Sequence, residues 1–343
     1  MERKYGKLET APRFLMEIEL VPVQGERFQP TGFPDLGSAV FERPDGRRML
    51  LVETAQSMAN RLENVCLKNG GPDISTELEG LPYIKVKLTG KNIDTETSSL
   101  IEAHRINSPF IISDSDFAAK FKQMASYSKG KPIDWKKVGQ TLFHFDINSL
   151  LHGAFMANLE DGRVKVPRML TGFIEAEDVR EASSGGVKNN PIDPSGKLRA
   201  ENLDKDVYGN VPFYRIEYTA AKIKAYFNLD LALIESYDLV PDARDLLITL
   251  SFYKISRFLR NGLRLRTACD LKIKDRIVVT EPAGFQFPAD EEIEGNLRDL
   301  IRSCTEKGLF SNPPVTLINT KVKEKEENPK NSGDQPKVTD QVD

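Results

Sequence analysis

Arginine is concentrated in one short segment that could bind phosphate. Arg257, Arg260 and Arg264 are spaced i, i+3 and i+7. The following residues read LRLRT, so that Arg264 and Arg266 would share one face of a strand. Each guanidinium offers a planar fork of donors, and arginines at this spacing can bind successive phosphates. The alternative is that these side chains form salt bridges with acidic residues of the same protein.

A second group of polar residues falls on one side of a predicted helix over residues 54–67. The side chains on this side are Gln56, Ser57, Asn60 and Arg61. Gln56 and Asn60 are i, i+4 neighbours, as are Ser57 and Arg61, so the four hydrogen-bonding groups form a compact patch. Amide, hydroxyl and guanidinium groups suit contacts to sugar and phosphate better than acid–base catalysis. An ordinary exposed helix face explains the same pattern.

Two histidines and an aspartate suggest a possible metal site. The segment LFHFDINSLLHGAF contains His144, Asp146 and His152, which could supply nitrogen and oxygen ligands to a metal. The apolar residues around them favour core packing instead, and Asp146 is placed to cap a short helix.

No other motif for catalysis or cofactor binding is present. The sequence lacks GxxxxGK[ST], HExxH and GxSxG, and no GxGxxG follows a strand. The cysteines Cys66, Cys269 and Cys304 are far apart, so neither a disulfide framework nor a zinc site is indicated. We therefore expect no cofactor, and a reducing compartment fits best.

Charge is segregated along the chain. The net charge is -3, which alone argues against binding nucleic acid through bulk charge. Residues 117–141, however, hold six lysines against one aspartate, and residues 252–276 hold eight lysines or arginines against two aspartates. Both stretches could be solvated faces, but the second is organised as described above, and the remainder of the chain is acidic.

The elements that must position these residues are of mixed type. Alternating apolar residues predict strands at Phe14–Leu20, Tyr83–Leu88 and Tyr214–Tyr218, and on odd positions from Ile223 to Leu233. Helical periodicity predicts helices at Thr54–Leu67, Asp242–Arg260 and Asp290–Thr305. The apolar stripe of the first helix would hold Ala55, Met58, Ala59, Leu62, Val65 and Cys66. The residues predict an α+β fold with an antiparallel sheet and long insertions.

One folded domain with a tail accounts for the length of 343 residues. The domain would span residues 1–318, with insertions at about 70–106 and 181–210. Residues 319–343 lack aromatic side chains and carry balanced charges, which is typical of a disordered tail. No apolar run reaches the roughly 18 residues of a membrane span. The sequence start is unlike a signal peptide, so we expect a cytoplasmic protein without a membrane partner.

Four segments, in order, resemble a known family. ETAQSMANRLE (residues 53–63), NSLLHGAF (148–155), LTGFIEAEDV (170–179) and LRLRTACDL (263–271) are similar to the RAMP-superfamily backbone subunit of type I-G (formerly I-U) CRISPR surveillance complexes, also called Cascade. The resemblance implies an RRM-like, ferredoxin-like palm with finger and thumb insertions. Residues 181–210 are the candidate thumb, and residues 70–106 are the alternative.

The resemblance also implies a function. Such subunits polymerise head-to-tail along a CRISPR RNA, meet the target DNA strand through that guide, contact other Cascade subunits, and do not cut. Guide contact would involve Gln56, Ser57, Asn60, Arg61, Arg257, Arg260, Arg264 and Arg266. Sequence-independent binding of this kind uses phosphate, sugar and 2′-hydroxyl contacts. The alternative function is a metal-dependent RNA nuclease that uses His144, Asp146 and His152.

Overall fold

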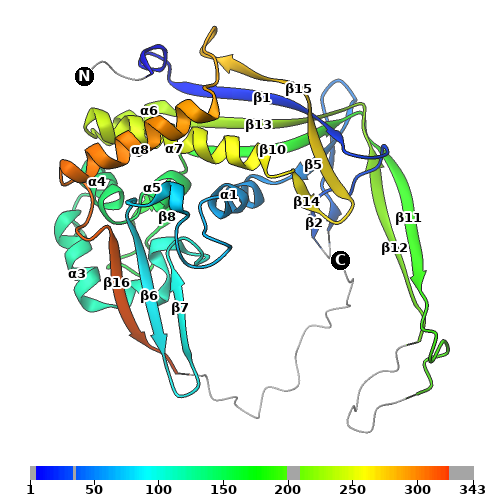
Figure 1. The fold of residues 1–343 in the computed structure, drawn as a ribbon, viewed down its shortest axis with the longest axis horizontal. Coiled ribbons are helices and arrows are strands. Elements are labelled where there is room, and N and C mark those ends of the chain that lie inside the picture. Colours follow the sequence, from blue (N-terminus) through cyan, green and yellow to red (C-terminus); the bar gives the residue numbers. More distant parts are fainter. Residues whose placement is uncertain (1–4, 34–35, 199–208, 324–343) are drawn as a thin grey trace.

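Four antiparallel strands and two helices form the centre of the molecule (Figure 1). The computed structural model describes residues 5–33, 36–198 and 209–323. The central elements are β1 (Arg13–Pro22), α1 (Ala55–Asn64), β10 (Leu170–Glu177), β13 (Lys222–Asp230), α7 (Pro241–Arg260) and β15 (Cys269–Glu281). The strands lie in the order β15-β1-β13-β10, and each neighbouring pair is antiparallel. This βαββαβ arrangement is the ferredoxin-like, RRM-like topology that the resemblance implied, and it confirms the α+β fold with an antiparallel sheet predicted from the residues.

Further strands widen this sheet to seven. β14 (Arg264–Arg266) joins the β15 edge, while β5 (Arg48–Glu53) and then β4 (Val40–Glu42) join the β10 edge. The remaining strands are β2 (Gly32–Phe33), β3 (Gly37–Ser38), β6 (Tyr83–Thr89), β7 (Asp94–Ser98), β8 (Ala154–Phe155), β9 (Lys165–Val166), β11 (Arg180–Lys188), β12 (Val211–Thr219) and β16 (Val315–Lys321). The remaining helices are α2 (Pro109–Ile112), α3 (Ser115–Met124), α4 (Trp135–Phe145), α5 (Ile147–His152), α6 (Leu231–Ser236) and α8 (Asp290–Glu306).

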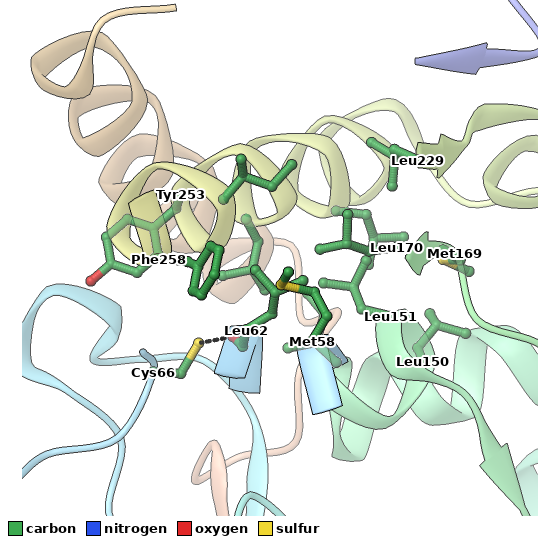
Figure 2. Close-up of a cluster of buried hydrophobic side chains, with 14 of the residues drawn as sticks. Met58, Leu62, Cys66, Leu150, Leu151, Met169, Leu170, Leu229, Tyr253 and Phe258 are labelled. Carbon is green, nitrogen blue, oxygen red and sulfur yellow. Dashed lines mark hydrogen bonds between the residues drawn. The ribbon is translucent and has the colours of Figure 1, made fainter. Parts of the chain in front are cut away.

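One face of the sheet is buried beneath the helices. Every second residue of β1 and β13 is buried, and the residues between them are half-exposed. Met58 and Leu62 of α1 meet Phe258 of α7 in the core (Figure 2). At Gly172 a Cβ atom would lie 3.1 Å from Met58 Cγ and 2.9 Å from a Phe227 ring carbon, so glycine allows the close approach of α1 to β10.

A second, three-stranded sheet lies beside the helices. β6 is its central strand, with β7 antiparallel on one side and β16 parallel on the other (Figure 1). The alternate insertion, residues 70–106, supplies β6 and β7. Since β16 continues to Lys321, the predicted tail boundary at residue 319 falls inside a paired strand. Residues 324–343 of the predicted tail lie outside the described residues.

The predicted long loop at 181–210 begins with one strand of a projecting hairpin. β11 and β12 pair from Arg180↔Thr219 to Lys188↔Val211 and extend away from the body as an arm (Figure 1). The sequence prediction missed β11, because its residues ASSGGVK lack an alternating apolar pattern. Residues 199–208 of this insertion lie outside the described residues.

Two further predictions need correction. The strand predicted to reach Leu233 ends at Asp230, whose side chain accepts a hydrogen bond from the Leu233 backbone N–H and caps α6. Ala55, predicted in the core, is exposed because it opens the first turn of α1. The other predicted strands and the three predicted helices are present, with shifts of a few residues at their ends. Among the described residues, no helix is long and apolar enough to cross a bilayer.

Candidate nucleic-acid interface

A buried carboxylate joins residues that are far apart in the chain. Glu53 ends β5 and is fully buried. Its oxygens accept hydrogen bonds from Ser57 Oγ, from Arg61 Nε at 2.8 Å, and from Arg266 Nη2. Arg266 Nη1 also donates to the Gln29 and Val52 carbonyl oxygens, each at 3.1 Å. Three of the predicted guide-contacting residues therefore meet, but their polar groups bind Glu53 and backbone carbonyls.

The exposed part of this surface lies on α1. Gln56 and Asn60 are exposed, and Gln56 Nε2 donates to Asn60 Oδ1 at 3.3 Å. Arg168, which sequence reasoning missed, donates to Gln56 Oε1 and, at 3.2 Å each, to the Ala55 and His152 carbonyl oxygens. The structure thus adds an arginine to the predicted amide patch.

Arg168 and Arg105 lie close together. Burial lowers the pKa of Arg168, the nearby Arg105 guanidinium lowers it further, and Glu63 raises it. Arg105 is itself paired with Glu63, with Nη2 and Oε2 at 2.8 Å. Arg168 instead donates to neutral oxygens, those of Gln56, Ala55 and His152.

A cleft at the root of the arm holds two exposed arginines. It has a volume of about 610 Å³ and is lined by Val23–Arg27, Glu217, Gly262, Arg264, Ala268 and Asp270. Arg27 lies 3.4 Å from Glu217, and Arg264 lies 3.7 Å from Asp270. The side chains of Arg27 and Arg264 are 56% and 72% exposed. Asp270 is also exposed, so its pair with Arg264 contributes at most about 1 kcal/mol and a phosphate could replace that carboxylate at little cost. Glu217 is buried, and it keeps a second partner, Arg215 at 3.4 Å, if Arg27 turns to a phosphate.

Arg27 was not predicted, because a single arginine in a loop gives no periodic signal. Its place in the cleft comes from pairing between distant segments. Phe28 bridges to Tyr218 at the root of the arm, and Arg215 Nη1 donates to Gln29 Oε1 at 3.0 Å. The loop that follows β1 is thereby fixed against β12.

The structure does not bring Arg257 and Arg260 to this cleft. Arg257 lies 3.1 Å from Glu294 of α8 and stacks over the Tyr253 ring at 5.3 Å. Arg260 pairs with Asp290, the first residue of α8. These two arginines join α7 to α8, which is the structural alternative considered for the arginine segment. The helix ends at Arg260, so Arg264 leaves the predicted i, i+7 face and lies in β14.

The candidate metal ligands have separate structural roles. Asp146 is buried and caps α5 through the Asn148 and Ser149 backbone N–H groups, as predicted. His144 Nδ1 contacts the Leu309 carbonyl oxygen at 3.1 Å, and His152 Nε2 lies 3.0 Å from Lys254 Nζ. Within residues 5–33, 36–198 and 209–323, no group of three or more His, Cys, Asp or Glu side chains is arranged to hold a metal.

A known protein family matches the N-terminal half of the chain. Residues 14–181, just under half of the chain, match the family described as CRISPR-associated protein GSU0053. The matched segment runs from β1 to the start of β11, so it includes Glu53, the α1 patch and Arg168 but not Arg264 or Arg266.

Two solved structures are similar to this chain at low identity. A chain of a CRISPR RNA-guided surveillance complex in a pre-nicking state is 12% identical, with a TM-score of 0.38 over 86% of this chain and 89% of that chain. Csc2 of Thermofilum pendens is 9% identical, with a TM-score of 0.29 over 89% of this chain and 82% of that chain. A search of curated proteins finds no match.

Proposed function

We propose that this protein is CRISPR-associated, as a non-catalytic backbone subunit that binds CRISPR RNA in a type I surveillance complex of subtype I-G. The observation that carries the proposal is the arm-root cleft, in which Arg27 and Arg264 are exposed, in a chain whose N-terminal half matches a CRISPR-associated family. Arg264 is in a long, exposed ion pair with Asp270, and Arg27 is in a long ion pair with the buried Glu217, which Arg215 also contacts. The guide would lie through this cleft and along the α1 patch with Arg168.

This arrangement suits binding that does not depend on base sequence. Arginine and amide groups can contact phosphate and ribose while the base edges stay free to pair with a target DNA strand. Among the predicted contacts we retain Gln56, Asn60 and Arg264 as direct ligands and add Arg27 and Arg168. Ser57, Arg61 and Arg266 act by fixing the site through Glu53. Arg257 and Arg260 fix α8 instead.

Assembly along the guide is part of the proposal. The arm projects from the body and exposes Phe213, Tyr214 and Val187. Exposed apolar groups on a projecting hairpin favour contact with another chain, and a contact between unlike surfaces gives a head-to-tail array. We assign the arm as the thumb and the β6–β7 segment to the body. Other Cascade subunits would complete the complex.

Co-purification tests this proposal. The full chain is expressed with a CRISPR array, and bound RNA and particle mass are measured by sequencing and by size exclusion with light scattering. We expect CRISPR RNA in particles of several protein copies whose mass increases with guide length. A monomer that carries no RNA, or only random cellular RNA, would contradict the assignment.

The non-catalytic part of the proposal has its own test. Labelled guide and target strands are incubated with the purified protein, with and without a divalent metal, and we expect both strands to remain intact. Metal-dependent cleavage that is lost in His144→Ala would establish the alternative nuclease function.

A further inference from the structure

A second basic surface lies at the end of the molecule opposite the arm (Figure 1). It is formed by the loop between α3 and α4 and by the first turn of α4. Trp135, the only tryptophan of the chain, is the first residue of α4, and its side chain is 42% exposed. Four lysines close to it in the sequence are exposed: Lys129, Lys131, Lys136 and Lys137.

The acidic side chains near this surface already have hydrogen-bond or ion-pair partners. Asp134 accepts from the Lys137 backbone N–H at 3.1 Å and caps α4. Asp238 lies 2.9 Å from Lys136 Nζ. Hydrogen bonds from the Tyr127 hydroxyl and the Gly130 backbone N–H hold the pKa of Asp161 below its ordinary value.

Three lysines remain without a carboxylate partner. Within the described parts of the chain, Lys129, Lys131 and Lys137 have no acidic oxygen within 4.0 Å, and Lys137 Nζ instead donates to Ser126 Oγ at 2.9 Å. The Trp135 ring likewise has no aromatic or cationic partner among the described residues. This surface therefore has both positive charge and a flat apolar ring available to a ligand.

The loop that carries the lysines is held in place. Arg163 Nη2 donates to the Lys131 carbonyl oxygen at 2.8 Å, and Asp161 accepts from the Gly130 backbone N–H at 2.9 Å. Tyr127 is buried and hydrogen-bonds to Asp161. The ligand thus meets a fixed backbone, and binding need only order the lysine side chains.

We propose that the Lys129–Lys137 surface binds single-stranded nucleic acid, with a base stacked on Trp135 and phosphates at Lys129, Lys131 and Lys137. Aromatic rings combined with a basic surface bind single strands with little regard to sequence, because every base has a flat face. An acidic peptide would satisfy the lysines but leaves the indole without a stacking partner. The inference is independent of the arm-root cleft, which lies at the other end of the molecule.

The single tryptophan makes the test direct. Fluorescence of the full-length protein is followed while oligodeoxythymidylate is added, because stacking on the indole quenches its emission. We expect saturable quenching whose apparent affinity falls as salt rises from about 50 to 200 mM. Replacement of all three lysines by glutamine (Lys129→Gln, Lys131→Gln, Lys137→Gln) should weaken binding at least tenfold.

A charge-matched control separates a local site from bulk charge. Lys87→Gln, Lys91→Gln and Lys321→Gln change three exposed lysines of the β6 sheet and should leave the quenching unchanged. Trp135→Ala, followed by anisotropy of a labelled strand, should lose about 5- to 100-fold in affinity, the range for one stacked base.

The proposal would be wrong if DNA did not quench the fluorescence, or if the two triple-lysine variants were quenched equally. It would also be wrong if polyglutamate displaced the DNA at equal charge concentration. Quenching by anionic vesicles but not by DNA would contradict it as well. Guide binding by the arm-root cleft is measured separately with Arg27→Ala and Arg264→Ala, which should leave Trp135 quenching intact. The two proposals can therefore fail independently.

Discussion

At the scale of single residues, Glu53 is the most consequential side chain of the candidate interface. It balances two guanidinium groups, from Arg61 and Arg266, that come from opposite ends of the domain. Removing one partner of a buried ion pair is costly, because the remaining charges stay away from water without compensation.

We predict that Glu53→Gln lowers the free energy of unfolding by about 3 kcal/mol. This is the lower end for buried pairs, because Arg61 and Arg266 keep 26% and 22% of their side-chain surface exposed. Urea denaturation measures the change. The matched control is Glu181→Gln, which breaks an exposed pair with Arg48 and should cost less than about 1 kcal/mol. Equal losses in the two variants would contradict the role given to Glu53.

His152 gives a pH prediction. Burial lowers the pKa of His152 well below its ordinary value, and Lys254, Arg105 and Arg168 add to the shift. Below about pH 6.5 His152 is therefore protonated in the unfolded chain but stays neutral in the folded protein. The stabilisation of the folded state by His152 is complete above that pH and is lost as the pH falls. Between about pH 6 and 5, the free energy of unfolding of His152→Gln should fall less steeply than that of the parent protein, by up to about 1.4 kcal/mol per pH unit.

The measurement is urea denaturation of both proteins across this pH range. Burial also lowers the pKa of His144, but that residue is present in both proteins and cancels in the difference. Parallel stability curves would show that His152 does not titrate between the folded and unfolded states as described.

At the scale of elements, the arm is held mainly by its own pairing and joins the body at its root. The paired residues run to Lys188↔Val211, and the contacts to the body come from Tyr218, Arg215 and Glu181 near the base. Folding of the seven-stranded sheet should therefore not require the distal part of the insertion.

We predict that replacing residues 189–210 with Asn-Gly leaves the thermal midpoint within a few degrees of the parent. Asn-Gly suits the two-residue turn that the Lys188↔Val211 register allows. Scanning calorimetry reports the midpoint. Because the variant keeps the exposed Val187, Phe213 and Tyr214, light scattering should still show multi-copy particles on guide RNA. Loss of those particles in a folded variant would place the subunit contact in residues 189–210 instead.

The sequence predicts elements well where one face is buried and periodic. Phe14–Leu20, Thr54–Leu67 and Asp242–Arg260 all appear because alternate or helical spacing reflects burial against the core. Neither β11 nor the hydrogen bonds around Glu53 produce such a pattern. A projecting hairpin buries little apolar surface, so its strands need no alternating apolar residues. Residues 53, 61 and 266 meet only through the tertiary fold, so their spacing in the sequence does not predict their contact.

The same reasoning explains the divided outcome for the arginine segment. The structure leaves Arg264 exposed in a cleft, where its predicted phosphate contact stays a prediction. Periodicity could not show that Arg257 and Arg260 face acidic residues of α8. Nor could it show that Arg266 turns inward to Glu53. The identity of a charged side chain's partner depends on which segments the fold brings alongside it.

At the scale of the whole molecule, a net charge of -3 is compatible with RNA binding because positive charge is presented at separate places. The arm-root cleft holds Arg27 and Arg264 at one end, and the Trp135 surface lies at the other (Figure 1). Acidic side chains occupy much of the open sheet face between them, where Glu17 and Glu19 pair with Lys224 and Lys274. These pairs leave little net positive charge on that face, so a polyanion should bind the basic places more strongly than the sheet.

The central claim is that guide RNA binds through the arm-root cleft, and the affinity of the Arg27→Ala, Arg264→Ala double variant for labelled CRISPR RNA tests it most directly. Anisotropy is measured between about 50 and 200 mM salt, with circular dichroism to confirm the fold. Loss of two phosphate contacts should weaken binding and reduce the slope of log affinity against log salt by about 2. Unchanged affinity and slope in a folded double variant would contradict the account.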